Sequence, residues 1–443
     1  MIRTKFFHAR RVLAVLLIST GAAWSQQQMS SYERGRATDM LQQIANDVKK
    51  HYYDPKFHGV DFDARVSEAK KGIENSKSFS MAMSHIAAAL DMLDDSHTFF
   101  VPPQHAYRHS YNMQYQMIGS RCFVTQVRPG SDAAAKGVKP GDEILAINGH
   151  PVDRDVFWKI QYLYSTLRPQ AAIRLNLKDP SGAQRQVDVA AKIQQTKRIS
   201  DLTGANDASD IWDIIRQEET EEHLMRARYV EYADQVTVLK VPEFAFSVGE
   251  VETMLSKARK HPNLVVDLRG NPGGSVETLK YLVGGMFDKQ VKIADRVGRK
   301  DTKPEIAKTL HNPYLGKMVV LVDARSASAA ELFARVIQLE KRGVVIGDKT
   351  SGAVMEAKHY EERSGTDTVA FYGASITEWD LKMTDGKSLE HVGVMPDEVA
   401  LPTEQDLVAG RDPVLAHAAE LLGVKITPEE AGKAFPYEWP PET

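Results

Sequence analysis

A short stretch around residue 328 places a serine where hydrolytic chemistry is possible. From Met318 to Leu339 the chain reads MVVLVDARSASAAELFARVIQL. A valine-rich apolar run, typical of a buried strand, is followed by small residues and then by apolar residues at helical spacing. Ser328 therefore stands at the carboxyl end of a strand and at the amino end of a helix. Backbone N–H groups there can stabilise an oxyanion, so Ser328 is a candidate nucleophile.

The same serine also fits a structural role. Ser328-Ala-Ala-Glu331 fits a capping box, in which the serine oxygen and the glutamate satisfy free N–H groups at the start of a helix. Ser326, two residues earlier, is the next candidate nucleophile. This stretch alone favours the cap, and other parts of the chain must decide between the two roles.

Two distant loops carry side chains that could act together with a serine. Ser96 and His97 follow an apolar helical pattern, and a histidine with a pKa of about 6.5 can act as a general base at neutral pH. Glu390 and His391 lie in the turn-rich loop Asp385–Asp397. Each residue also has an ordinary interpretation, because a lone histidine is usually a surface or hydrogen-bonded residue and Glu390 could be an exposed carboxylate.

Composition indicates a globular chain and excludes several classes of function. The 443 residues are 42% hydrophobic and 26% charged, which is enough for two or three domains. A net charge of −3 favours neither nucleic acid nor an anionic membrane as a partner. The single cysteine, Cys122, excludes an internal disulfide. The 14 histidines show no zinc-type spacing, so we expect no metal and no cofactor.

Residues 1–25 have the pattern of a secretory signal peptide. Basic residues precede the apolar run Val12–Ile18, and small residues follow near Ser25. A retained N-terminal anchor is the alternative, but the apolar run is too short to span a bilayer comfortably. We therefore predict an exported protein, periplasmic or extracellular, with no integral membrane segment after signal cleavage.

The remaining pattern predicts an α/β protein of several segments. Apolar runs alternate with a helical pattern in the main domain, which indicates β-α-β units and a mainly parallel sheet. Its loop Asp267–Gly274 is rich in glycine but lacks the lysine motif of nucleotide sites. The predicted segments are an N-terminal helical segment (30–104), a small domain (105–195), a polar linker (196–228), the main domain (229–405) and a C-terminal helical tail (406–443).

Residues 124–149 have the sequence VTQVRPGSDAAAKGVKPGDEILAING. The placing of its turn residues, glycine, proline and Asn-Gly, strongly resembles a PDZ domain. That family binds peptide C-termini by strand addition, with loop amides holding the carboxylate. The resemblance implies a peptide-binding role for Met117, Ile118 and Gly119. Because Gln116–Ser120 matches the apolar glycine motif of the family poorly, a spacer that positions or gates the next domain remains an alternative.

Three separated motifs, DLRGNPGG, SASAAE and LEHVGVMPD, together resemble the C-terminal processing (tail-specific) serine peptidases. With the PDZ domain in its usual order, the resemblance covers most of residues 30–405. It implies a crotonase-like α/β core and makes Ser328 the nucleophile. The lysine of the Ser–Lys branch is absent, because Ala353 occupies its place.

The chain instead resembles the catalytic core of tricorn protease, a branch that uses a histidine, a serine and a glutamate. This resemblance implies that His97 is the base, that Ser96 and Glu390 orient it, and that the N–H groups of Gly274 and Ala329 form the oxyanion hole.

The predicted function is an exported serine peptidase that hydrolyses peptide bonds of unfolded or C-terminally exposed polypeptides. The alternative is an inactive or weak relative of the same fold that binds peptides or apolar ligands, as interphotoreceptor retinoid-binding proteins do. The missing lysine favours the alternative, whereas the complete set of four side chains favours the peptidase.

Overall fold

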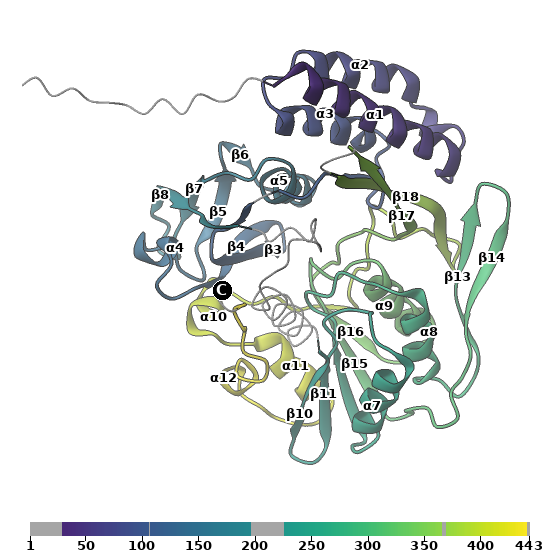
Figure 1. Ribbon diagram of the computed structural model, residues 1–443. Coiled ribbons are helices and arrows are strands. Elements are labelled where there is room, and N and C mark those ends of the chain that lie inside the picture. The colour runs from purple at the N-terminus through teal and green to yellow at the C-terminus, as the bar shows by residue number, and fades with distance from the viewer. Residues whose placement is uncertain (1–28, 106, 196–225, 366–368, 441–443) are drawn as a thin grey trace, which may run out of the picture.

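A six-stranded sheet forms the centre of the predicted main domain (Figure 1). The computed structural model describes residues 29–105, 107–195, 226–365 and 369–440. The predicted signal peptide and most of the predicted linker lie outside these residues. The strand order of the sheet is β10 (Arg228–Tyr232), β11 (Val236–Lys240), β12 (Asn263–Asp267), β15 (Lys317–Val322), β16 (Val344–Gly347) and β19 (Glu398–Val399). β10 is antiparallel to β11, and the later pairs are parallel.

Both faces of this sheet are covered, as its continuous apolar strands require. Val266 and Val320 belong to a core shared with α7 (Val248–Ala258), α8 (Val276–Gly284) and α9 (Ala329–Leu339). Their neighbours Val265 and Val319 belong to a core on the other face. That second core is shared with α11 (Pro413–Leu421) and α12 (Pro428–Ala431), which follow α10 (Glu404–Ala409).

A second, five-stranded sheet was not predicted, and it is antiparallel. Its long central strand β18 pairs with both β1 and β13. The strands are β1 (Phe99–Val101), β13 (Val291–Gly298), β14 (Thr302–Ala307), β17 (Met355–Ser364) and β18 (Ala370–Met383). The described sheets are therefore mixed, and the prediction of mainly parallel pairing applies to the six-stranded sheet alone.

The N-terminal segment is helical, as expected, and packs on this second sheet. It contains α1 (Ser31–His51), a 3-10 turn (Phe57–Gly59), α2 (Phe62–Glu74) and α3 (Phe79–Asp91). Its core includes Tyr372, Ala374 and Ile376 of β18. The helix α2 was not predicted, because Phe62, Ala69 and Ile73 are its only buried residues and their spacing is too sparse for a clear amphipathic pattern.

The predicted PDZ segment forms an antiparallel sheet with two short helices beside it (Figure 1). Its elements are β3 (Met113–Ile118), β4 (Arg121–Val127), α4 (Asp132–Ala135), β5 (Glu143–Ile147), β6 (His150–Pro151), α5 (Phe157–Tyr162), β7 (Ala172–Lys178) and β8 (Gln184–Ala190). α5 continues into a π-helical turn, Leu163–Leu167. The strands β2 (Tyr107–Ser110) and β9 (Lys192–Gln195) pair at the base of the domain. None of the helices in the described residues has the length and apolar character needed to cross a bilayer.

Candidate active site

Ser328 lies in the turn that leads from β15 into α9 and has a strained backbone. Its φ of 53° and ψ of −118° fall in a region that non-glycine residues rarely adopt, at a cost of about 1–3 kcal/mol. Two contacts hold this conformation, because the Ser328 N–H lies 2.8 Å from the carbonyl oxygen of Ala353 and 3.0 Å from Oε2 of Glu331. The strain at Ser328 is thus maintained by the surrounding structure.

The glutamate half of the predicted capping box is present, since Glu331 accepts the Ser328 N–H. The N–H of Glu331, however, donates to the backbone carbonyl of Ser328 at 2.9 Å. The rival serine has a structural role: Ser326 is fully buried, donates to the carbonyl of Leu268 (2.9 Å) and accepts the N–H of Asp323 (3.0 Å). Ser328 is therefore the better placed of the two candidate nucleophiles.

Ser96, His97 and Glu390 form a continuous hydrogen-bonded chain across 294 residues of sequence. The Ser96 hydroxyl lies 2.7 Å from Nδ1 of His97 and 2.9 Å from Oε2 of Glu390, while the Ser96 N–H donates to Oε1 (2.7 Å). A hydroxyl has one hydrogen, and a carboxylate can only accept it. Ser96 must then accept from a protonated Nδ1, which leaves Nε2 of His97 unprotonated and free to act as a base.

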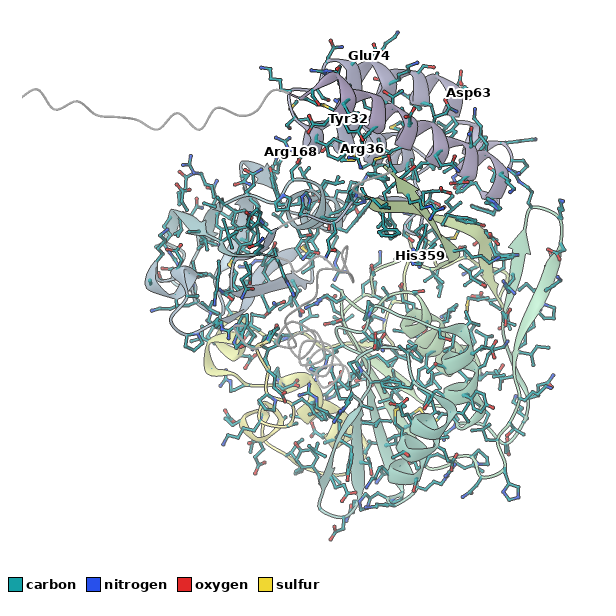
Figure 2. All side chains as sticks on the ribbon, viewed as in Figure 1. Tyr32, Arg36, Asp63, Glu74, Arg168 and His359 are labelled. Atoms are coloured by element: carbon teal, nitrogen blue, oxygen red, sulfur yellow. The ribbon has the colours of Figure 1, made fainter. Side chains whose placement is uncertain are left out.

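Burial sets the charge states of this chain. The half-buried position of His97 lowers its pKa below 6.5, with Asp95 opposing this effect and His359 of β17, labelled in Figure 2, adding to it. Burial also raises the pKa of Glu390, against the pull of its hydrogen bonds from Ser96 and Val354. At neutral pH the imidazole is therefore neutral, which is the form that a general base needs.

Asp95 holds the backbone at His97, a contact that the sequence did not reveal. Its carboxylate accepts the N–H groups of His97 (2.8 Å) and Thr98 (3.0 Å) and the hydroxyl of Thr377 on β18 (2.7 Å). The only local signal is its place two residues before His97, where aspartate commonly closes a turn by accepting backbone N–H groups. The contact with Thr377 depends on the sheet that was not predicted.

Ser328 and the hydrogen-bonded chain of Ser96, His97 and Glu390 meet on one loop. Ala353 accepts the Ser328 N–H, and the next residue, Val354, donates its N–H to Glu390 at 2.8 Å. No hydrogen bond joins the Ser328 hydroxyl to His97 among the described residues. Such bonds are often long in unliganded sites and tighten when substrate binds.

The predicted oxyanion-hole residues border Ser328. A Cβ added to Gly273 would lie 2.5 Å from Cβ of Ser328, so the glycine loop packs directly against the serine. The N–H of Gly273 is occupied by Asn271 Oδ1 (2.7 Å). Within the described residues, the N–H groups of Gly274 and Ala329 have no hydrogen-bond acceptor. These two amides therefore remain available for an oxyanion.

Other candidates are engaged elsewhere. His391, the rival base, is exposed and its Nε2 lies 2.9 Å from the carbonyl of Asp94, so this nitrogen donates and cannot also take a proton. Met117 and Ile118 of β3 are buried, and the N–H of Gly119 in the following turn donates to Asp348. Peptide binding by these three residues stays a prediction.

No group of three or more potential metal ligands occurs among the residues that the structure describes.

Comparisons with known proteins support the two resemblances. The model of peptidase family S41 matches residues 235–400, and a PDZ domain model matches residues 123–168. The chain is 25% identical over 278 residues to the tail-specific protease of Haemophilus influenzae, covering 58% of this chain and 36% of that protein. It is 24% identical over 398 residues to the putative tricorn protease homolog 2 of Streptomyces coelicolor, covering 84% of this chain and 31% of that protein.

Other matches cover more of the compared protein. The carboxy-terminal processing protease CtpA of Bacillus subtilis is 23% identical over 402 residues, which covers 88% of this chain and 76% of that protein. The crystal structure of mature CPAF superposes with a TM-score of 0.62 at 16% identity, covering 85% of this chain and 95% of that chain, which shows a common fold. None of these comparisons favours the ligand-binding alternative. The chain therefore contains a domain that matches peptidase family S41, a family of serine-type peptidases, and a segment ahead of it that matches a PDZ domain.

Proposed function

We propose that this protein hydrolyses peptide bonds of polypeptides, with Ser328 as nucleophile and His97 as general base. The observation that carries the proposal is the chain from Glu390 through Ser96 to Nδ1 of His97, which leaves Nε2 unprotonated. A serine in a strained strand-to-helix turn is tied to this chain by the adjacent residues Ala353 and Val354.

The proposed reaction follows from these positions. Nε2 of His97 takes the Ser328 proton as Oγ attacks the scissile carbonyl, and the N–H groups of Gly274 and Ala329 stabilise the oxyanion. The imidazolium then donates its proton to the leaving amine, which produces an acyl-enzyme. Water attacks the acyl-enzyme in the same way and releases the second product. The buried Glu390 carboxylate, acting through Ser96, stabilises the imidazolium in both steps.

The substrates that fit this proposal are unfolded or C-terminally exposed polypeptides. Relatives named as tail-specific and carboxy-terminal processing proteases support this class. Export, a periplasmic or extracellular location and a crotonase-like core remain predictions from the sequence.

A fluorophosphonate probe tests the proposal directly, because it labels only an activated serine. We expect the purified wild-type protein to be labelled at Ser328, as mapped by mass spectrometry of the labelled peptide. The Ser328→Ala variant should be unlabelled and inactive on a denatured polypeptide while keeping the wild-type unfolding temperature to within a few degrees. An active Ser328→Ala variant would show that the nucleophile is another residue.

A further inference from the structure

The PDZ domain contacts both halves of the candidate site. Arg154, in the segment between β6 and α5, reaches the loop that follows β16. Its guanidinium donates to Oδ2 of Asp348 (2.6 Å), to the carbonyl of Lys349 (2.9 Å) and to the carbonyl of Gly119 in its own domain (2.6 Å). The Gly119 N–H donates to the same Asp348 oxygen (2.8 Å). One carboxylate of the S41 domain is thus bound by two groups of the PDZ domain.

This junction is largely buried, so each charge in it depends on its partner. The side chains of Arg154 and Asp348 are only 24% and 10% exposed. Burial raises the pKa of Asp348, and the Arg154 guanidinium opposes that effect. A buried pair of this kind is strongly disturbed when one partner is removed, because the other charge is left without compensation.

From the junction, a short loop leads to the nucleophile. Thr350 donates its hydroxyl to Oε1 of the buried Glu331 (2.6 Å), and the N–H groups of Gly352 and Ala353 donate to the same carboxylate (2.8 and 3.0 Å). The carbonyl of Ala353 then accepts the Ser328 N–H. Hydrogen bonds therefore hold most of the loop that runs from Asp348 to Ala353, whose carbonyl contacts Ser328.

The part of the site that contains His97 is contacted by α5, the helix that follows Arg154 in the PDZ domain. On α5, the hydroxyl of Tyr162 donates to the carbonyl of Phe100 in β1, and Lys159 lies 2.9 Å from Asp91 at the end of α3. β1 begins directly after the loop that carries His97. Figure 1 shows α5 between the N-terminal helices and the remainder of the PDZ domain.

We propose that the PDZ domain braces the two halves of the active site, and that Arg154 is a positioning residue for Ser328. This inference rests on the proposed function and assigns the domain a role in the reactivity of the serine. Arg154 acts through Asp348 and the loop to Ala353, without touching the substrate.

A matched pair of PDZ arginines tests the proposal. Arg154→Met keeps the apolar stem and removes the contacts to the S41 domain. Arg174→Met removes a guanidinium whose partner among the described residues, Asp188, lies inside the PDZ domain. We expect fluorophosphonate labelling of Ser328 to slow by about 10- to 100-fold in Arg154→Met, because small misplacements of reacting groups have effects of this size. The Arg174→Met variant should stay within about twofold of wild type. A small ester substrate should show a lower kcat with little change in KM.

The double variant Arg154→Met/Asp348→Asn separates positioning from loss of a domain contact. Removing the uncompensated carboxylate should restore part of the labelling rate, although the double variant has fewer contacts between the domains. A folded Arg154→Met protein that is labelled within twofold of wild type would overturn the proposal.

Hydrogen exchange gives a readout that does not depend on activity. The amide groups of Gly352 and Ala353 should exchange at least tenfold faster in Arg154→Met than in Arg174→Met. If the wild-type protein is not labelled at all, the proposed function is wrong. The hydrogen-exchange comparison still tests whether the PDZ domain braces the site. Unchanged exchange at these two amides in that case would overturn the brace as well.

Discussion

Two buried glutamates serve the two halves of the site in different ways. Glu331 is fully buried, and its four hydrogen-bond donors are three backbone N–H groups and the hydroxyl of Thr350. Glu390 accepts two backbone N–H groups and also the hydroxyl of Ser96, which contacts the base. Glu331 therefore fixes the backbone around Ser328, the proposed nucleophile, whereas Glu390 fixes the direction of the Ser96 hydroxyl proton next to His97, the proposed base. A conservative amide substitution should consequently affect the two halves differently.

The largest effect is expected at the base that Glu390 serves. His97→Ala should lower hydrolysis of a denatured polypeptide by about 10²- to 10⁴-fold, the range typical of a lost general base. His391→Ala is the matched control: Nε2 of this exposed histidine donates to the carbonyl of Asp94, with Oε1 of Glu390 at 3.7 Å, so this nitrogen cannot take a proton, and the variant should stay within about threefold. If His391→Ala is inactive while His97→Ala still cleaves, the assignment of the two histidines is wrong.

A smaller loss is expected for Glu390→Gln. The glutamine can still accept the Ser96 hydroxyl through its carbonyl oxygen, but its NH2 group then faces the Ser96 N–H, and the charge that stabilises the imidazolium is gone. We expect kcat to fall by about 10- to 100-fold with KM little changed, as for a group that acts mainly on the transition state. Steady-state kinetics on a peptide substrate measures both constants. A normal kcat would indicate that Ser96 alone orients His97.

The pH profile tests whether the charge of Glu331 matters for the nucleophile. Burial raises the pKa of Glu331 to about 7, although all four of its partners are donors that require the carboxylate form. The pKa of His97 lies below 6.5, so Glu331 should set the apparent midpoint of fluorophosphonate labelling near 7. In Glu331→Gln the remaining labelling should be slower and its midpoint should move below 6.5. An unchanged midpoint would show that Glu331 does not titrate in the reaction.

The last effect concerns stability, which should fall as the pH rises whereas activity should increase. Because the pKa of Glu331 is higher in the folded state than its ordinary 4.5, the folded protein binds this proton more tightly. This proton binding contributes up to about 3 kcal/mol to the free energy of unfolding. The contribution is fully present below pH 4.5 and is lost as the pH rises to about 7. Urea unfolding of wild type and Glu331→Gln at several pH values isolates the effect. Parallel stability curves would contradict a raised pKa at this position.

Elements with strong local patterns could be predicted from the sequence. The helix expected after Ser328 is present over Ala329–Leu339, because its apolar residues recur at helical spacing after a turn of small residues. The strand before it, β15, covers the valine-rich apolar run that begins at Met318 and starts one residue earlier. In the PDZ domain, α5 begins at Phe157, after a turn in which Asp153 accepts the N–H groups of Asp155 and Val156.

The sequence by itself determined the two domain families, the turn that presents Ser328 and the side chains available for its chemistry. Their motifs consist of neighbouring residues whose glycine, proline and apolar spacing dictates local conformation. Only the tertiary structure decided which of these side chains meet. The contact of Ser96 with Glu390, the anchoring of Asp95 to Thr377 and the junction of Arg154 with Asp348 join residues 194 to 294 positions apart. Such pairs depend on how sheets and domains pack, and hydrogen bonds between distant polar groups leave no periodic pattern in a single sequence.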